Sequence, residues 1–392
     1  MKLSPFIAAL TIALVSTGCV SSGNDRTEES NKAAQLSNPD SSLTTQELYR
    51  KLVSLEDKTE NKLLSGLFGG YSDIERTDYG RYNGDGEFVQ DEQGQKVDDN
   101  EMVRIEKVTG KRPVIYACDF GLGWNAYEKA SDAIYTGCAE DLILKAKQGH
   151  VVQISNHLIS PINTFSDNFK TAVSNQEYAR IFETGSVERA RWLDIMDEVA
   201  IGLEKFKQAD VPVIFRPLHE MNGDWFWWGA DNAEGGTAER QALFVKLYQD
   251  MHKYLSEDKG LNNLIWVYSP DRGRPSLVEY YPGDAYVDIV GLDAYFNGQA
   301  DIDDLKADYR VMTTTFNKPY ALTETGPRSN WNPNGRWLPK TPFDYHNLIK
   351  EIEKDMPKTA FFITWNTGFG PSWNLNAKEA FNHPWVATLG EF

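Results

Sequence analysis

Eight short apolar runs recur along the chain, separated by segments long enough to hold a helix. Each run is rich in Val, Ile, Leu or Phe and is bounded by polar residues, a pattern that predicts buried β-strands. We expect these strands at residues 63–71, 113–118, 151–155, 211–217, 264–269, 287–295, 319–323 and 360–365.

Most of the intervening segments carry apolar residues at helical spacing, as in 187–208 and 239–257. Near-continuous apolar strands are typical of parallel strands that are covered on both faces. Eight of them with helical crossovers predict an α/β fold, a single (β/α)8 TIM barrel over residues 44–392. A doubly wound open sheet is the alternative, but no Gly-rich dinucleotide motif follows the first strand.

The amino terminus has a different pattern. Residues 1–18 are typical of a secretory signal peptide, because Lys2 supplies the positive start and residues 6–15 form an apolar run too short to span a membrane. The S-T-G-C sequence ending at Cys19 resembles a bacterial lipobox, with Ser where Leu is usual. We therefore expect an acylated Cys19, with an ordinary signal peptide as the alternative. Val20 is not the Asp that commonly signals inner-membrane retention, which favours a lipid anchor in the outer membrane.

Residues 19–43 are polar and rich in Ser, Asn, Asp and Glu, so they predict a flexible tether. A capping-box pattern at Thr44 and Glu47 then predicts the start of a helix. Its expected apolar face comprises Leu48, Leu52 and Leu55.

Charge and composition narrow the partners of the chain. A formal net charge of −17 argues against nucleic acid and against an anionic membrane surface. Membrane contact is therefore expected only through the lipid at Cys19, and the protein is expected to be a monomer. Cys118 and Cys138 lie in an exported domain, where a disulfide and two buried thiols both remain open. No Cys/His spacing resembles a zinc site, and we expect no metal and no cofactor.

Two glutamates each follow a predicted strand. Glu220 comes just after the fourth strand, and Glu324 just after the seventh. Because the carboxyl ends of barrel strands meet at one mouth, the two carboxyl groups can face each other. Such a pair beside aromatic loops can break a glycosidic bond: one group protonates the leaving oxygen while the other attacks or stabilises the sugar. Two structural, salt-bridged glutamates are the alternative.

The most specific motif is R-P-L-H-E-M-N-G-D-W-F-W-W at residues 216–228. With T-E-T-G around Glu324, S-N-H-L, G-L-D-A-Y and I-T-W-N, it resembles glycoside hydrolase family 26, whose commonest activity is β-mannanase. The resemblance runs from about residue 46 to the end, and His219 before the acid is a mark of that family. It implies retaining cleavage of β-1,4-mannosidic linkages in mannan, galactomannan or manno-oligosaccharides, either endo or exo with short products such as mannobiose.

The resemblance also implies roles for seven residues. Glu220 would be the acid/base and Glu324 the nucleophile. The expected substrate-binding residues are His157, His219, Trp225, Tyr295 and Trp365. Trp225 and Trp365 would be stacking platforms, because pyranose rings present C–H patches to flat aromatic faces.

Neighbouring positions leave further interpretations open. Tyr295 is a candidate hydrogen-bond donor to the nucleophile. Arg216 either holds a carboxylate ionised or forms a salt bridge in the barrel core, and Asn222 is a turn residue or a site residue. Trp331 and Trp337 are candidates for outlying contacts with the substrate.

Three other functions compete with mannan hydrolysis. The same catalytic pair would serve a hydrolase of mixed-linked β-glucan or β-1,3-xylan. A non-catalytic glycan-binding surface lipoprotein would keep the aromatic platforms but would not need two opposed carboxylates. A metal-dependent hydrolase would need a His/Asp ligand cluster, and no such cluster is visible in the sequence.

Overall fold

The computed structural model describes residues 35–57, 62–69, 101–121, 131–163, 168–298, 301–331, 337–339 and 342–392. The expected signal peptide, Cys19 and the first part of the expected tether fall outside these residues.

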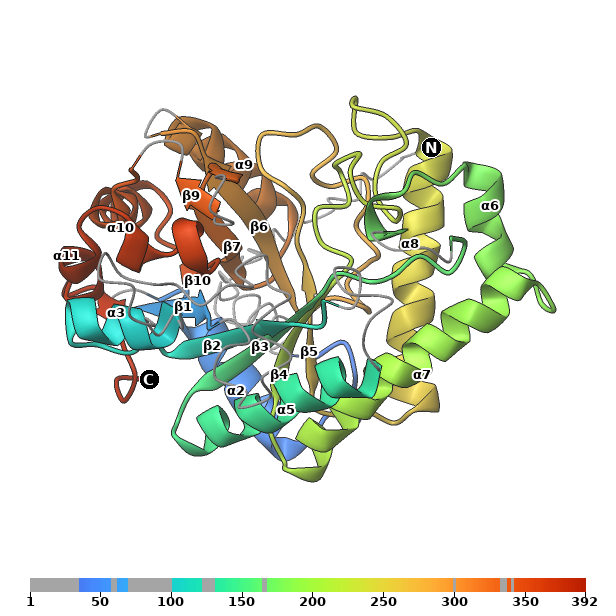
Figure 1. The fold of residues 1–392 in the computed structure, drawn as a ribbon, viewed down its shortest axis with the longest axis horizontal. Helices are drawn as coiled ribbons and strands as arrows, with labels where there is room; N and C mark the ends of the chain where they lie inside the picture. Colours follow the sequence, from blue (N-terminus) through green and yellow to red (C-terminus); the bar gives the residue numbers. More distant parts are fainter. Residues whose placement is uncertain are drawn as a thin grey trace, which may run out of the picture.

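A closed barrel of eight parallel strands forms the centre of the described structure (Figure 1). The strands follow the chain around the barrel, and the last pairs with the first, Leu64 lying opposite Phe361. They are β1 (Leu63–Phe68), β2 (Ile115–Asp119), β3 (Val151–Asn156), β4 (Val213–Pro217), β5 (Leu264–Tyr268), β6 (Ile289–Phe296), β7 (Tyr320–Pro327) and β10 (Thr359–Thr364). The predicted (β/α)8 barrel is thus confirmed, with small differences in strand ends.

Helices lie around the outside of the barrel (Figure 1). They are α2 (Leu43–Ser54), α3 (Glu101–Thr109), α5 (Ser131–Lys147), α6 (Asn175–Ala179), α7 (Val187–Gln208), α8 (Ala238–Lys253), α9 (Asp301–Thr315), α10 (Tyr345–Asp355) and α11 (Ala377–Phe381). The predicted segment 187–208 coincides with α7, and the segment 239–257 continues from α8 into a π-helical turn at Tyr254–Asp258. The described residues also form three short strands: β8 (Ser329–Trp331), β9 (Trp337–Pro339) and β11 (Val386–Ala387).

Strand alternation divides the core into two layers. Ile214 and Ile265 belong to the cluster inside the barrel, whereas their neighbours Phe215 and Trp266 belong to the cluster between barrel and helices. The inner cluster also contains Tyr49 and Leu52 of α2, together with Leu55 at its C-cap. Helix α2 therefore packs its apolar face against the interior of the barrel, and the expected face of that helix is confirmed.

The start of α2 differs from the expectation. Ser42, not Thr44, is the N-cap, and its hydroxyl accepts a hydrogen bond from the Thr45 N–H at 3.2 Å. No acidic residue lies in the first turn of α2, so the capping-box prediction was wrong. The Thr44 hydroxyl is used elsewhere, because it donates to the Asp210 carboxylate at 2.7 Å.

Residues 35–42, placed by the sequence in the polar tether, contact the loops that precede β5 and β6. The Ser42 N–H donates to the Asn262 carbonyl at 2.8 Å. The backbone N–H of Ser37 donates at 2.5 Å to the buried carboxylate of Asp288, which also accepts from the Trp266 N–H. These loops lie at the amino ends of β5 and β6. The segment 35–42 is therefore at the end of the barrel opposite the carboxyl ends of the strands.

Cys118 at the end of β2 and Cys138 in α5 form a disulfide, with Cα atoms 6.3 Å apart. The structure thus selects the disulfide from the two alternatives that the sequence left open. The bond ties the carboxyl end of a barrel strand to the helix that follows it.

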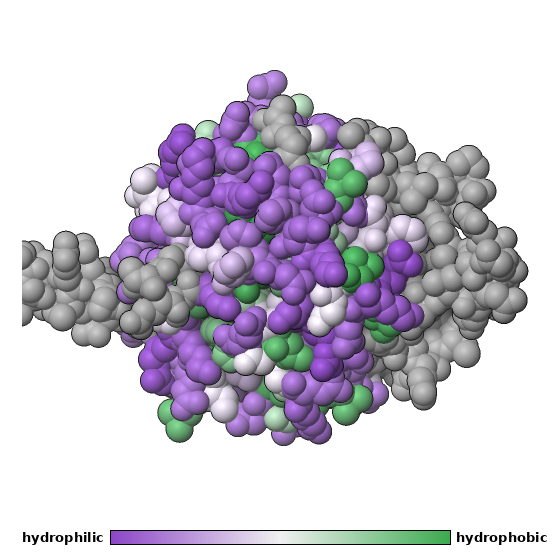
Figure 2. All heavy atoms as spheres, turned by 90° about the vertical axis from the view of Figure 1, so that its left-hand side faces the viewer, coloured by the Kyte–Doolittle hydropathy of each residue, from purple (hydrophilic) through white to green (hydrophobic). Residues whose placement is uncertain are grey.

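The surface in Figure 2 is covered mainly by hydrophilic side chains, with apolar residues scattered between them. Single exposed apolar residues are ordinary on soluble domains. Within the described residues, no helix combines the length and the apolarity needed to cross a membrane.

Candidate active site

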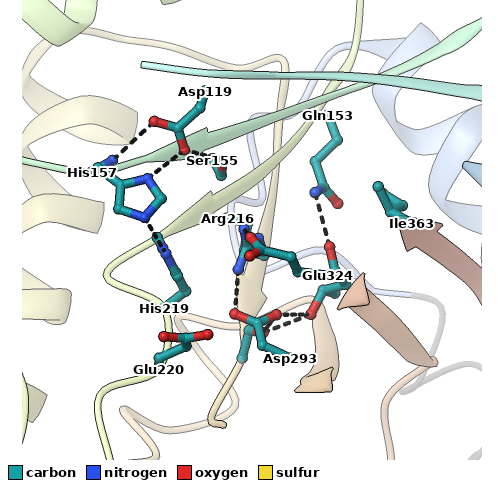
Figure 3. Close-up of polar contacts among 12 residues, drawn as sticks. Asp119, Gln153, Ser155, His157, Arg216, His219, Glu220, Asp293, Glu324 and Ile363 are labelled. Carbon is teal, nitrogen blue, oxygen red and sulfur yellow. Dashed lines mark hydrogen bonds and ion pairs between the residues drawn. The ribbon is translucent and has the colours of Figure 1, made fainter. Parts of the chain in front are cut away.

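Glu220 and Glu324 both lie at the carboxyl end of the barrel, and Figure 3 shows them among other buried polar side chains. Glu220 follows β4 by three residues, as expected. Glu324 lies inside β7 rather than after it, which corrects the predicted strand end at residue 323. The pairing with β6 shifts here, since Leu292 pairs with Leu322 and Asp293 with Glu324, leaving Thr323 as an extra residue. This bulge re-aims the side chain that follows it.

A strained backbone turn presents Glu220. Leu218 and Glu220 have φ of 51° and 53°, so two non-glycine residues on either side of His219 adopt the left-handed region. Each such residue costs about 1–3 kcal/mol, and such strain is found at functional sites. The Glu220 N–H donates to the Ser269 carbonyl and the Trp228 indole donates to the His219 carbonyl, each at 2.8 Å. These bonds hold the turn 218–220, which we call the elbow.

Glu220 has the surroundings of a general acid. Its side chain is buried, and the indole N–H of Trp225 donates to its Oε2 at 2.6 Å. Burial raises the pKa of Glu220 well above its usual value, and Asp271, Asp293 and Glu324 raise it further. The hydrogen bond from Trp225 opposes this rise. A carboxyl group held protonated in this way can deliver a proton to a leaving oxygen.

Glu324 is surrounded by donors instead. The Tyr295 hydroxyl donates to its Oε1 at 2.5 Å, and the guanidinium of Arg216 forms an ion pair with its Oε2. The Glu324 side chain is buried, so neither contact is shared with bulk water. The structure therefore provides the contact from Tyr295 that the sequence suggested.

Arg216 forms a salt bridge in the barrel core, one of the two roles that the sequence left open. Its guanidinium is buried and contacts both Glu324 and Asp293. Asp293 also accepts hydrogen bonds from the hydroxyls of Ser269 at 2.6 Å and Thr323 at 2.9 Å. Sequence reasoning missed Asp293, although its place two residues before Tyr295 on one strand puts both on the same face.

His219, Asp293 and Glu324 offer three possible metal-ligand atoms, which lie within 4.8 Å of one another. The two carboxylates already share the guanidinium of Arg216. A divalent ion would have to share these carboxylates with a buried permanent cation, so the charges disfavour a metal here.

The two histidines expected to bind the sugar face each other. His157 follows β3, and its Nε2 lies 3.2 Å from the Nε2 of His219. The Nδ1 of His157 lies 2.8 Å from the carboxylate of Asp119, the last residue of β2. Burial alone would raise the pKa of Asp119, but the facing His157 and the Ser155 hydroxyl hold it below the usual value. Asp119 is a second residue that sequence reasoning missed.

Trp225 and Trp365, the two expected stacking platforms, both contact residues of the site. The Trp225 indole bonds to Glu220, and the guanidinium of Arg274 lies 4.9 Å from its ring centroid. Trp225 is thus part of the surroundings of the acid. Trp365 is half-buried beside Phe68, with ring centroids 4.3 Å apart, and its ring centroid lies 6.0 Å from that of His157.

Four further tryptophans can also be placed. Trp227 and Trp228 are both buried in the core. Trp331 and Trp337 pair with each other in the β8–β9 hairpin, and their side chains fall outside the described part.

Asn222 fastens the loop after β4 to the loop after β5. Its side-chain amide donates to the Asp271 carbonyl at 2.9 Å and accepts from the Asp271 N–H at 2.8 Å. Asp271 contributes to the raised pKa of Glu220. The two hydrogen bonds from Asn222 therefore keep a second carboxyl group beside the acid.

The chain is similar to known proteins in sequence and in fold. The model of a family described as "Glycosyl hydrolase family 26" matches residues 37–391. The chain is 37% identical over 354 residues to a mannan endo-1,4-β-mannosidase of Bacillus subtilis, covering 90% of this chain and 88% of that protein. It is 36% identical over 367 residues to mannan endo-1,4-β-mannosidase A and B of Caldalkalibacillus mannanilyticus, covering 93% of this chain and 64% of that protein. A solved structure of Bacillus subtilis mannanase man26 superposes with a TM-score of 0.75 at 36% identity, covering 91% of this chain and 96% of that one.

Proposed function

The chain belongs to glycosyl hydrolase family 26, and on this premise we propose that it is a mannan endo-1,4-β-mannosidase that cleaves with retention of configuration. The observation that carries the mechanism is the contrast between two buried glutamates. Glu220 is held protonated among other carboxyl groups, whereas Glu324 lies between a cation and a phenol. This contrast provides an acid and a nucleophile in one site.

In the first step, Glu220 donates its proton to the glycosidic oxygen while Glu324 attacks the anomeric carbon. The bond to the leaving sugar breaks, and a covalent glycosyl ester forms on Glu324. Ester formation removes the negative charge of Glu324 that faces Arg216. Asp293 still contacts the same guanidinium, so the buried Arg216 keeps one carboxyl partner.

In the second step, Glu220 takes a proton from water, and the hydroxide oxygen replaces Glu324 at the anomeric carbon. The structure supplies a reason for the change of role. The negative charge of Glu324 is one of the causes that raise the pKa of Glu220. Esterification removes this charge, so the pKa of Glu220 falls at the stage where it must act as a base.

Mannan is the preferred substrate because the relatives named above are described as mannanases. Cleavage of mixed-linked β-glucan or β-1,3-xylan is the second candidate, since the catalytic pair does not discriminate between these glycans. One weaker relative, matching 41% of the chain at 26% identity, is described as an endoglucanase of Acetivibrio thermocellus.

The test is hydrolysis of mannan, galactomannan, mixed-linked glucan and β-1,3-xylan by the wild type, Glu220→Ala and Glu324→Ala. We expect the wild type to cleave mannan fastest, with long early products that indicate endo action. Both variants should lose activity, and azide should restore the Glu324→Ala variant with inverted products. Binding of mannan without cleavage by the wild type would instead support a glycan-binding protein.

We also propose that Cys19 carries the lipid that anchors a monomeric enzyme to the outer membrane. The S-T-G-C sequence supports this proposal. Mass spectrometry of the amino-terminal peptide from membranes should show a diacylglyceryl group on Cys19. The Cys19→Ala variant should appear in the soluble periplasmic fraction, and an unmodified wild-type peptide beginning at another residue would contradict the proposal.

A further inference from the structure

A line of buried polar groups runs from β2 to the elbow. The Ser155 hydroxyl and the His157 ring contact the Asp119 carboxylate, and the other side of the His157 ring contacts His219 (Figure 3). Asp119 and His157 are 4% and 5% exposed and His219 is 1% exposed, so these contacts are shielded from water.

The contacts constrain where the protons lie. The lowered pKa of Asp119 makes its carboxylate an acceptor, so the Nδ1 of His157 carries a proton. Whenever the His157 ring is neutral, its Nε2 is then an acceptor. With that acceptor 3.2 Å from the Nε2 of His219, the proton of the neutral His219 ring lies on its Nε2. Burial and Arg216 lower the pKa of His219 well below its usual value, which keeps this ring neutral.

The last ring in the line belongs to the elbow. His219 stands between the two left-handed residues Leu218 and Glu220. Its carbonyl is held by Trp228, and its ring is held by His157. Strained backbone of this kind persists only where surrounding contacts overdetermine it. The contacts of the His219 ring therefore help to fix the position of the next residue, Glu220.

We propose that Asp119 is a positioning residue for the acid/base: it fixes the proton of His157, and His157 in turn fixes His219 and the elbow that carries Glu220. This inference rests on the proposed function only for its kinetic consequence. Asp119 lies on β2, two strands away from the strand that leads into the elbow, and does not act on the substrate.

The test compares Asp119→Asn with Asp288→Asn. Both are buried aspartates that accept from a serine hydroxyl and from at least one backbone N–H, but Asp288 lies at the opposite end of the barrel. An Asn at 119 can donate to the Nδ1 of His157 and so select the wrong tautomer. We expect kcat on mannan to fall about 10–100-fold in Asp119→Asn with a smaller change in KM, whereas Asp288→Asn keeps the wild-type kcat.

A second measurement does not depend on catalysis. The chain has six histidines, so their ring ¹⁵N signals can be separated by NMR. The wild type should show one histidine protonated at Nδ1 and another at Nε2, with the first signal changed in Asp119→Asn. If that variant does not fold, the wild-type spectrum and the milder Ser155→Ala variant decide the matter.

Two results would overturn the inference. One is a bare Nδ1 on His157 in the wild type. The other is a kcat of folded Asp119→Asn equal to that of Asp288→Asn. A wild type that leaves mannan intact but shows the expected tautomers would reject the proposed function alone.

Discussion

At the scale of single residues, the site is a group of carboxyl groups around one buried guanidinium. Asp271, Asp293 and Glu324 all raise the pKa of Glu220, and Arg216 contacts only the last two of them. The arrangement is costly for folding, because buried charges are stabilised only by close partners. It is useful for catalysis, because the same repulsion keeps a proton on the acid.

Replacing the acid should therefore stabilise the protein. The pKa of Glu220 in the folded protein is raised above its value in the unfolded chain. The contribution of Glu220 to folding stability is therefore fully present below the unfolded pKa, and it is lost as the pH rises from there toward the folded pKa. We expect Glu220→Gln to unfold at a higher temperature than the wild type, with an advantage that grows by about 1.4 kcal/mol per pH unit in that window. Thermal unfolding measured from pH 4 to pH 8 tests this, with pH 4 near the ordinary glutamate pKa of about 4.3.

The matched variant for this measurement is Glu324→Gln. It weakens the ion pair of buried Arg216, so it should lower the unfolding temperature. A Glu220→Gln variant less stable than the wild type at every pH would contradict the assignment of a strained, protonated acid.

The hydroxyl of Tyr295 should matter mainly for the rate. Tyr295→Phe removes the donor that lies 2.5 Å from Glu324, and we expect kcat to fall about 100-fold. Tyr320→Phe is the control, because the buried Tyr320 hydroxyl has no hydrogen-bond partner among the described residues. Steady-state kinetics on mannan should separate the two variants, and equal losses would mean that the phenol of Tyr295 has no special role.

At the scale of elements, two local irregularities place the two glutamates. The elbow after β4 presents Glu220, and the bulge in β7 presents Glu324. Each is held from a neighbouring element: Ser269 after β5 binds the elbow, and the side-chain amide of Gln153 in β3 donates to the Thr323 carbonyl at 3.3 Å. The regular barrel thus supports a site made of irregular backbone.

Gly223 makes room for the indole that contacts the acid. A Cβ added at Gly223 would lie 2.2 Å from the Cη2 atom of Trp225, so Gly223→Ala must displace that ring. Loss of its hydrogen bond to Glu220 should raise the pKa of the acid further, because this bond lowers it. We expect a lower kcat/KM and an alkaline limb of the pH profile that moves to higher pH.

The pH profile of Gly110→Ala provides the control. Gly110 has a positive φ of 74° and open space around the added Cβ, at a position just after α3. This variant should lose some stability but keep the wild-type profile. An unchanged profile in Gly223→Ala would show that Trp225 does not tune the acid.

At the scale of the whole molecule, the two ends of the barrel serve different purposes. Helix α2 and residues 35–42 lie at the end where the strands begin, with Ser37 bound to Asp288. The catalytic candidates lie at the other end. This division is general for (β/α)8 barrels, where loops after the strands carry the chemistry and the opposite face supports stability.

The disulfide should stabilise the whole domain. It joins residues 20 apart, so in the chain-entropy model its loss costs about 3 kcal/mol. We expect the double variant Cys118→Ala, Cys138→Ala to unfold at a lower temperature by calorimetry, with mannan hydrolysis retained at 25 °C. Unfolding at the wild-type temperature would show that the cross-link does not contribute, and Cys138→Ala alone would report the effect of a free Cys118.

The sequence by itself determined the strands, the main helices and the order of the two glutamates, because hydrophobic periodicity is a local property of the chain. It also suggested the contact between Tyr295 and Glu324, because a motif placed both residues at strand ends. Only the tertiary structure revealed Asp119 and Asp293, since their contacts depend on barrel closure and register. The left-handed elbow and the bond from Trp225 to Glu220 were likewise decided there, because neighbouring elements impose backbone angles that no local preference selects.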